Sequence, residues 1–348
     1  MSAACILGCS GPEITPDEKA FFGEVKPWGF ILFARNVVSA EQVRRLVDDL
    51  RAAADDEDAP VFVDQEGGRV QRLKPPLARL RRPAALFGQL YARSPQIARE
   101  AVWLNHRLLA HELSEVGLDA DCAPCVDLLH PGAHGVIGDR AFGDDPDPVS
   151  VLGRAAMDGL LAGGVAPVVK HIPGHGRARV DSHVALPRVT TSLAELEETD
   201  FRPFRALADA PMAMTAHVVY AAVDPEHCAT VSHRVITTVI RGHIGFDGLL
   251  MSDDLSMKAL GGDLAERTRR SLEAGCDVVL HGNGALVGEP VRDLMGELKV
   301  IADHCGELSG RAAERAETAR ASARRVQPFD PEAAEARLAE LGLDGREG

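Results

Sequence analysis

An aspartate and a histidine two residues apart, Asp181 and His183, form the clearest candidate acid/base pair in the sequence. They belong to residues 168–187, a segment rich in glycine, histidine and charge that opens with a short β-branched run. In an extended loop, alternate side chains lie on the same side, so the carboxylate can bond a ring nitrogen of the histidine. Such a bond favours the imidazolium, which can donate a proton in one step and accept one in the next near neutral pH. The spacing is equally compatible with a loop tied down by an Asx-type hydrogen bond.

Two adjacent carboxylates, Asp253 and Asp254, follow the apolar residues 248–251 and provide a second candidate group. Adjacent strand residues point to opposite faces, so only one of the two can face a given cavity. Cleavage of a glycosidic bond with retention requires a carboxylate below the anomeric carbon and a proton donor near the leaving oxygen. The residue pattern favours Asp253 only slightly over Asp254.

Metal and cofactor motifs have little support in the sequence. The spacing of His171, His175 and His183 does not match a zinc site, and no cysteine lies near them along the chain. The pair Cys122 and Cys125 has the spacing of a redox motif, but it lies inside an apolar run and not at the start of a helix. Neither a G-x-G-x-x-G nor a Walker pattern occurs. We therefore expect no metal and no cofactor.

Eight short apolar segments recur along the chain, each followed by a helical pattern or a polar loop. They are residues 5–9, 29–34, 61–63, 120–126, 166–169, 212–216, 248–251 and 277–280. Helical periodicity occurs at residues 39–54, 97–116, 149–162, 193–207, 233–243 and 264–274, with Ser39 and Ser192 as N-caps and Gly117 and Gly275 as C-caps. Strand–helix alternation implies a parallel sheet, and eight repeats imply a closed barrel.

The predicted fold class is therefore α/β, a single TIM-type (β/α)8 barrel at residues 1–285. Only helical sequence rich in Ala, Glu and Arg follows, so residues 286–348 are expected to form a helical extension packed on the barrel, with disordered final residues. No second run of strands occurs, and no β-sandwich domain is predicted.

Polar side chains follow the predicted strands, at the end where a barrel places its active site. They are Arg35, Asn36, Asp64, Glu66, Arg69, Asp127, Lys170, His171, His217, Ser252, Asp253, Asp254, His281 and Asn283. Any one of them could be a solvated turn residue or a structural hydrogen-bonding group. So many on one rim indicate a binding site, and carboxylates together with Lys and Arg suit the hydroxyl groups of a sugar.

Composition limits the partners. With 38 basic and 52 acidic residues among 348, the net charge is −14, which argues against nucleic acid or an anionic membrane surface. Aromatic residues make up only 4%, which favours a small soluble ligand over a long polysaccharide. Seven scattered cysteines, no secretory signal pattern and no apolar run of about 18 residues favour a reduced, cytoplasmic protein. We expect a monomer.

Six motifs in order resemble the family 3 glycoside hydrolases, and among these the bacterial β-N-acetylglucosaminidases of cell-wall recycling. They are Asp64-Gln-Glu-Gly-Gly-Arg-Val-Gln-Arg72, Gly138-Asp-Arg140, Lys170-His-Ile-Pro-Gly-His-Gly176, Asp181-Ser-His183, Met214-Thr-Ala-His217 and Gly245-Phe-Asp-Gly-Leu-Leu-Met-Ser-Asp253-Asp-Leu-Ser-Met257. The resemblance runs through most of the predicted barrel. It departs at Ile172, where phenylalanine is common, and in residues 177–180. The C-terminal β-sandwich of some relatives is missing.

The resemblance implies a two-step retaining mechanism without a cofactor. By motif match Asp253 is the nucleophile, which decides against Asp254; His183 is the acid/base and Asp181 orients it. The residues implied to hold the N-acetylglucosamine ring are Asp64, Arg72, Arg140, Lys170 and His171, and we add His217 from the fifth motif. The implied substrate is N-acetylglucosamine linked β-1,4 to 1,6-anhydro-N-acetylmuramic acid, with or without peptide, in the cytoplasm.

Two alternative functions use the same sugar site: one transfers the sugar to phosphate instead of water, and the other binds the sugar without cleaving it. A phosphorylase remains open, because a neutral acid/base tolerates an anionic acceptor and phosphate could replace water. A non-catalytic sugar sensor would lack at least one of Asp181, His183 and Asp253, yet all three are present.

Overall fold

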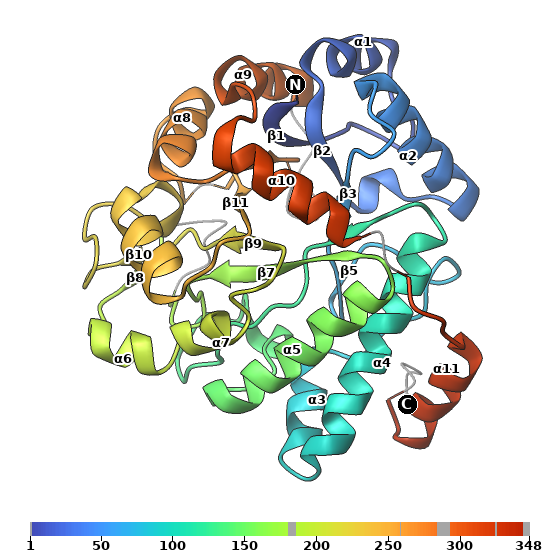
Figure 1. The fold of residues 1–348 in the computed structure, drawn as a ribbon, viewed down its shortest axis with the longest axis vertical. Helices are drawn as coiled ribbons and strands as arrows, with labels where there is room; N and C mark the ends of the chain where they lie inside the picture. The colour runs from blue at the N-terminus through green and yellow to red at the C-terminus, as the bar shows by residue number, and fades with distance from the viewer. Residues whose placement is uncertain (1, 180–185, 258, 284–292, 324–325, 344–348) are drawn as a thin grey trace.

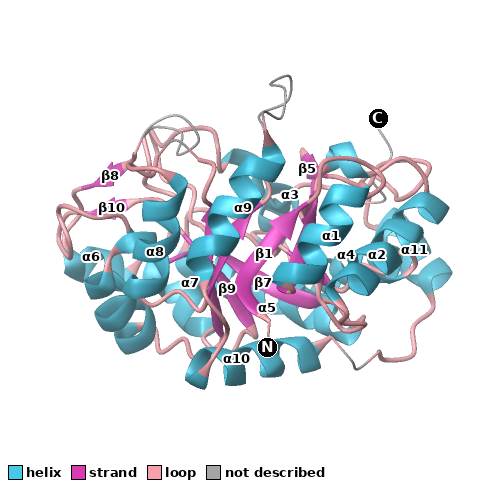
Figure 2. Ribbon diagram, turned by 90° about the horizontal axis from the view of Figure 1, so that it is seen from above, coloured by secondary structure: helices cyan, strands magenta, loops and turns pink. Residues whose placement is uncertain are grey.

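The computed structural model describes residues 2–179, 186–257, 259–283, 293–323 and 326–343, and eight parallel strands form a closed barrel at its centre (Figures 1 and 2). Around the barrel the order is β1-β12-β11-β9-β7-β6-β3-β2. The strands are β1 (Ala3–Gly8), β2 (Pro27–Leu32), β3 (Val61–Val63), β6 (Ala120–Asp121), β7 (Ala166–Ile172), β9 (Met212–Thr215), β11 (Leu249–Asp254) and β12 (Val278–His281). Each overlaps one of the eight predicted segments, so the predicted fold class is confirmed.

Helices surround the barrel and continue after its last strand. They are α1 (Pro16–Val25), α2 (Ala40–Ala54), α3 (Ala84–Tyr91), α4 (Pro95–Ser114), α5 (Pro146–Ala162), α6 (Leu193–Glu198), α7 (Phe201–Ala206), the π-helix η4 (Val235–His243), α8 (Leu264–Ala274), α9 (Leu294–Cys305), α10 (Gly310–Ser322) and α11 (Pro331–Glu340). Within the described part of the chain, no helix is both long and apolar enough to cross a membrane.

Local capping explains where several helices begin. The hydroxyl groups of Ser39 and Ser192 accept hydrogen bonds from backbone N–H groups in the first turns of α2 and α6, as predicted. Helix α1 was not predicted from the sequence, although Thr15 and Glu18 form a complete capping box there.

One predicted helix, residues 193–207, is divided into α6 and α7 at Thr199 and Asp200. The carboxylate of Asp200 is buried and binds Arg177 Nε at 2.6 Å and His130 Nε2 at 2.9 Å. These partners lie on other loops, so a tertiary requirement overrides the local helical pattern.

Helix α10 closes the N-terminal end of the barrel (Figure 2). Its residues Ala316 and Ala319 belong to the same buried cluster as Trp28 and Met212, which lie at the beginnings of β2 and β9. Helix α9 follows β12 and packs against β1 and α8, whereas α11 packs against α4. The opposite end carries two small sheets, the hairpin of β4 (Gln65–Gly67) and β5 (Val70–Gln71) and the pair of β8 (Arg188–Val189) and β10 (Val219–Tyr220).

Candidate active site

Three charged side chains occupy one inward-facing layer at the C-terminal end of the barrel. The interior cluster includes Phe62 of β3, Val168 of β7 and Met251 of β11, and these three strands alternate around the barrel. Two residues after each of these positions the chain carries charge. These residues are Asp64, which directly follows β3, Lys170 of β7, and Asp253 of β11, whose charge acts on the buried thiol of Cys122. Alternate strands contribute to one layer of a barrel interior, so these three side chains converge.

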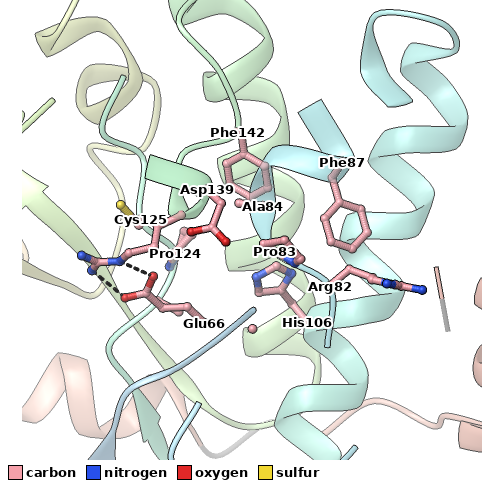
Figure 3. A pocket seen from close by; sticks show the side chains of 13 residues that line it. Glu66, Arg82, Pro83, Ala84, Phe87, His106, Pro124, Cys125, Asp139 and Phe142 are labelled. Carbon is pink, nitrogen blue, oxygen red and sulfur yellow. Dashed lines mark hydrogen bonds and ion pairs between the residues drawn. The ribbon is translucent and has the colours of Figure 1, made fainter. Parts of the chain in front are cut away.

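Five charged side chains form a continuous network at this end of the barrel. Lys170 Nζ lies 2.9 Å from Asp64 Oδ1 and 2.6 Å from Glu66 Oε1. Asp64 Oδ2 accepts from Arg72 at 2.8 Å, and Arg140 binds both oxygens of Glu66 at 2.7 and 2.8 Å (dashed in Figure 3). Cations and carboxylates therefore alternate, and we call the set Arg72, Asp64, Lys170, Glu66 and Arg140 the charged network.

The protonation of the charged network follows from burial and neighbouring charge. Burial raises the pKa of Asp64, but the charges of Lys170 and Arg72 outweigh it and hold that pKa far below its usual range. Burial likewise raises the pKa of Glu66, yet Arg140 and Lys170 bring it down to about 2. Burial lowers the pKa of Lys170, and the two carboxylates more than reverse this. All members are therefore charged at neutral pH. The cations can donate hydrogen bonds to hydroxyl groups, and the carboxylates can accept them.

Asp127, which follows β6, positions the histidines after Lys170. Its Oδ2 lies 2.6 Å from His171 Nδ1, and its Oδ1 accepts from the backbone N–H of His175 at 2.6 Å. Burial raises the pKa of Asp127, but the charge of His171 and its hydrogen bond bring it well below the usual range. An ionised carboxylate only accepts, so His171 carries a proton on Nδ1 and presents Nε2 to a ligand. Burial lowers the pKa of His175 to about 4, which keeps that ring neutral.

The adjacent aspartates have different surroundings. The carboxylate of Asp254 accepts from the backbone N–H groups of Ser256 at 2.9 Å and Gly282 at 3.4 Å, so it fastens the end of β11 to the end of β12. Asp253 lies close to the barrel interior, because its charge acts on the buried thiol of Cys122. Burial raises the pKa of Cys122, and the charges of Asp64 and Asp253 raise it further. The geometry thus favours Asp253 as the carboxylate in the cavity, independently of the sequence resemblance.

His217, which we expected to contact the sugar, is bonded within the protein through both ring nitrogens. Its Nδ1 lies 2.7 Å from the hydroxyl of Thr230, and its Nε2 lies 3.3 Å from the carbonyl oxygen of Asp254. The side chain is fully buried, which lowers its pKa. With both nitrogens bonded inside the protein, His217 holds β9 against the end of β11.

The polar rim divides into two halves. Around β1, β2 and β12, the side chains bond to the protein itself: Arg35 donates to the carbonyl oxygens of Cys9, Gly282 and Asn283 at 3.0, 2.5 and 3.0 Å. Around β3, β6, β7 and β11 lie the charged network, Asp127 and Asp253. Asp181 and His183, the expected acid/base pair, lie outside the residues that the structure describes.

Glu66 and Asp127 were predicted from the sequence only as polar residues that follow strands, and no specific role in the site was assigned to them. Glu66 lies two positions after Asp64, and this alternation could have assigned it to the site. The partners of Asp127 lie 44 and 48 residues away, so spacing gave no comparable signal.

A pocket adjoins the charged network between the barrel and helices α3 and α4 (Figure 3). Its lining includes Glu66, Arg140, His106, Cys125 and Phe87. Burial lowers the pKa of His106 to about 4, so its imidazole is neutral. Glu66 and Arg140 therefore line the pocket and also belong to the charged network.

Comparison with known proteins gives consistent results. Residues 18–312 match the family model described as Glycosyl hydrolase family 3 N terminal domain. The chain is similar to a beta-hexosaminidase of Alkalilimnicola ehrlichii, with 42% identity over 282 residues and 79% of each chain covered. It is also similar to one of Pseudomonas aeruginosa, with 39% identity over 303 residues, 86% of this chain and 88% of the relative.

Among solved structures, the chain is similar to NagZ from Neisseria gonorrhoeae in complex with N-trifluoroacetyl-D-glucosamine. The TM-score is 0.81 with 32% sequence identity, and the match covers 98% of this chain and 95% of that chain.

Replacing Lys170 by Met should strongly destabilise the fold, because Asp64 and Glu66 would lose their shared cation while remaining buried. Breaking a buried ion pair from one side costs about 3–5 kcal/mol, which urea denaturation can measure. Lys26→Met is the matched control, because Lys26 Nζ also lies 2.9 Å from a carboxylate, that of Asp55, but at the surface. The unfolding midpoint of the control should hardly change. Equal effects of the two substitutions would contradict the structural role given to Lys170.

Acid should destabilise the protein partly through Glu66. Its pKa falls from an ordinary 4.5 to about 2 on folding, so the ionised group contributes stability above about pH 4.5 and this is lost as the pH falls towards 2. The free energy of unfolding, measured by urea denaturation across this window, should fall less steeply in Glu66→Gln than in the wild type. Other buried carboxylates keep some slope in the variant. Parallel pH profiles of the two proteins would refute the assignment.

Proposed function

The chain belongs to glycosyl hydrolase family 3, and we propose that it is a retaining exo-β-N-acetylglucosaminidase of peptidoglycan recycling. As a glycoside hydrolase, it would remove the terminal non-reducing N-acetylglucosamine from N-acetylglucosaminyl-1,6-anhydro-N-acetylmuramic acid and its peptides. Relatives named beta-hexosaminidase, and a NagZ structure in complex with an N-acylated glucosamine, support this substrate class. We propose that it acts as a cytoplasmic monomer on this small soluble substrate.

The observation that carries the proposal is the layer shared by Asp253, Asp64 and Lys170 at the mouth of the barrel. A nucleophile must approach C1 while the ring hydroxyls are held, and one rigid layer provides both functions. The carboxylates of the charged network accept hydrogen bonds from hydroxyl groups, and its cations donate them. His171, oriented by Asp127, adds a ring nitrogen.

In the proposed first step, the carboxylate of Asp253 attacks C1 and the bond from C1 to the glycosidic oxygen breaks. His183 gives its proton to that oxygen, and a covalent glycosyl-enzyme forms. In the second step, His183 removes a proton from water, which attacks C1 and expels Asp253, so the β configuration is retained. Asp181, two residues from His183, supports the imidazolium. The support for Asp181 and His183 is their sequence motif.

Removing the proposed nucleophile should allow chemical rescue by a small anion. Asp253→Gly should lower kcat on p-nitrophenyl β-N-acetylglucosaminide by roughly 10⁴-fold or more. Azide, which fits the vacated space, should restore turnover and give the α-glycosyl azide, identified by NMR. Asp254→Gly is the control: it should lose stability through the contacts with Ser256 and Gly282, and azide should not rescue it. Rescue of Asp254→Gly instead would reassign the nucleophile.

The acceptor in the second step can be identified from the product. With phosphate varied, a hydrolase should release free N-acetylglucosamine at a rate independent of phosphate, initially as the β anomer. This can be followed by NMR and by chromatography of sugar phosphates. Accumulation of N-acetylglucosamine 1-phosphate in proportion to phosphate would make the protein a phosphorylase and overturn the hydrolytic step.

A further inference from the structure

Cys125, Asp127 and His171 bring three different ligand atoms together beside the charged network. A sulfur, a carboxylate oxygen and an imidazole nitrogen lie within 4.8 Å of one another, the one such group found in the described part of the chain. Cys125 Sγ lies 3.4 Å from Asp127 Oδ2, which lies 2.6 Å from His171 Nδ1. The three residues are 4%, 0% and 6% exposed. This set differs from the histidines weighed as zinc ligands in the sequence.

Strand β7 and the segment that follows β6 hold these residues in place. Cys125 forms a parallel bridge with Lys170, the residue before His171. The backbone hydrogen bonds from Val126 to Lys170 at 3.0 Å and from Lys170 to Pro124 at 3.1 Å continue the pairing on both sides. Ligands on paired strands are better preorganised than ligands on separate loops.

The distances suit a tetrahedral ion after a small adjustment. With bonds of about 2.3 Å to sulfur and about 2.0 Å to nitrogen and oxygen, tetrahedral ligand atoms lie about 3.3–3.5 Å apart. The 3.4 Å between Cys125 Sγ and Asp127 Oδ2 already agrees. Asp127 Oδ2 and His171 Nδ1 are closer because a hydrogen bond joins them, so a metal ion would take the place of that hydrogen.

We propose that Cys125, Asp127 and His171 form an inhibitory site for a borderline-soft divalent cation of the Zn²⁺ class. A ligand set of sulfur, nitrogen and oxygen selects such an ion over Mg²⁺ or Ca²⁺, and water or a sugar hydroxyl would complete the coordination. Binding releases the thiol proton of Cys125. It also displaces the proton from His171 Nδ1, so the metal-bound ring carries its proton on Nε2 and presents a donor to the sugar.

The surrounding charges do not oppose a cation. Arg140, whose charge acts on Cys125, is held by Glu66 through two hydrogen bonds. Lys170 is held by Asp64 and Glu66. The site therefore offers an ion one carboxylate, one imidazole and one thiol, whose proton the ion displaces.

Cobalt spectroscopy tests the site without any enzymatic assay. Titration of the wild type with Co²⁺ should produce a thiolate-to-cobalt charge-transfer band in the near ultraviolet, and added Zn²⁺ should remove it. Cys125→Val should lack this band, since valine suits the apolar neighbours Ile137 and Ala141. Cys122→Ala is the matched control, because Cys122 is equally buried nearby but faces the barrel interior. The band should persist there.

The cobalt experiment tests the metal site separately from the glycosidase proposal. A band that is absent from the wild type, or that survives in Cys125→Val, would overturn the site, and neither result bears on the glycosidase proposal. Circular dichroism checks that each variant is folded.

Inhibition is then measured relative to the uninhibited activity of each variant. Loss of an outer-shell partner already weakens metal binding by about 10- to 100-fold, so loss of a direct ligand should raise the inhibitory Zn²⁺ concentration at least about tenfold. Cys122→Ala should match the wild type. Equal inhibition of Cys125→Val and wild type would show that any bound metal is not inhibitory at this site.

Discussion

The ammonium group of Lys170, shared by two buried carboxylates, is the interaction on which the site depends. Moving a charge out of water is costly, and Lys170 is 2% exposed. Asp64 and Glu66 compensate this cost from the other side of β6, and each is also bound by an arginine. The network thereby links β3, the β4–β5 hairpin, β7 and the loop that carries Arg140. A bound sugar can then form hydrogen bonds with donors and acceptors whose positions are already fixed.

The barrel explains why the charged side chains meet. Inward positions on alternate strands share a layer, so residues far apart in sequence converge with no local motif in common. The adjacent aspartates have different surroundings, since Asp254 joins β11 to β12 while the charge of Asp253 acts on Cys122 in the barrel interior. Because α10 covers the other end of the barrel, charged inward residues can be solvated only at this end.

What could be predicted from the sequence was mostly local. The eight strands and the serine caps depend on periodicity and short hydrogen bonds, which the sequence carries directly. The break between α6 and α7 depends on Asp200 reaching Arg177 and His130, which no helical pattern contains. Strand-end position identified the rim, but it could not separate Arg35, bonded to three carbonyl groups, from Lys170 in the site. The surroundings of His217 could not be predicted for the same reason, because a motif does not reveal that both ring nitrogens are bonded within the protein.

Charge balance also bears on which acceptor completes the reaction. Arg72, Lys170 and Arg140 are each bound to a carboxylate of the network. A phosphate dianion near C1 would have to compete with Asp64 and Glu66 for these cations. Water carries no charge and does not face this competition. The proposed histidine acid/base would add no negative charge of its own, so it would permit phosphate but would not attract it. The described half of the site therefore favours hydrolysis.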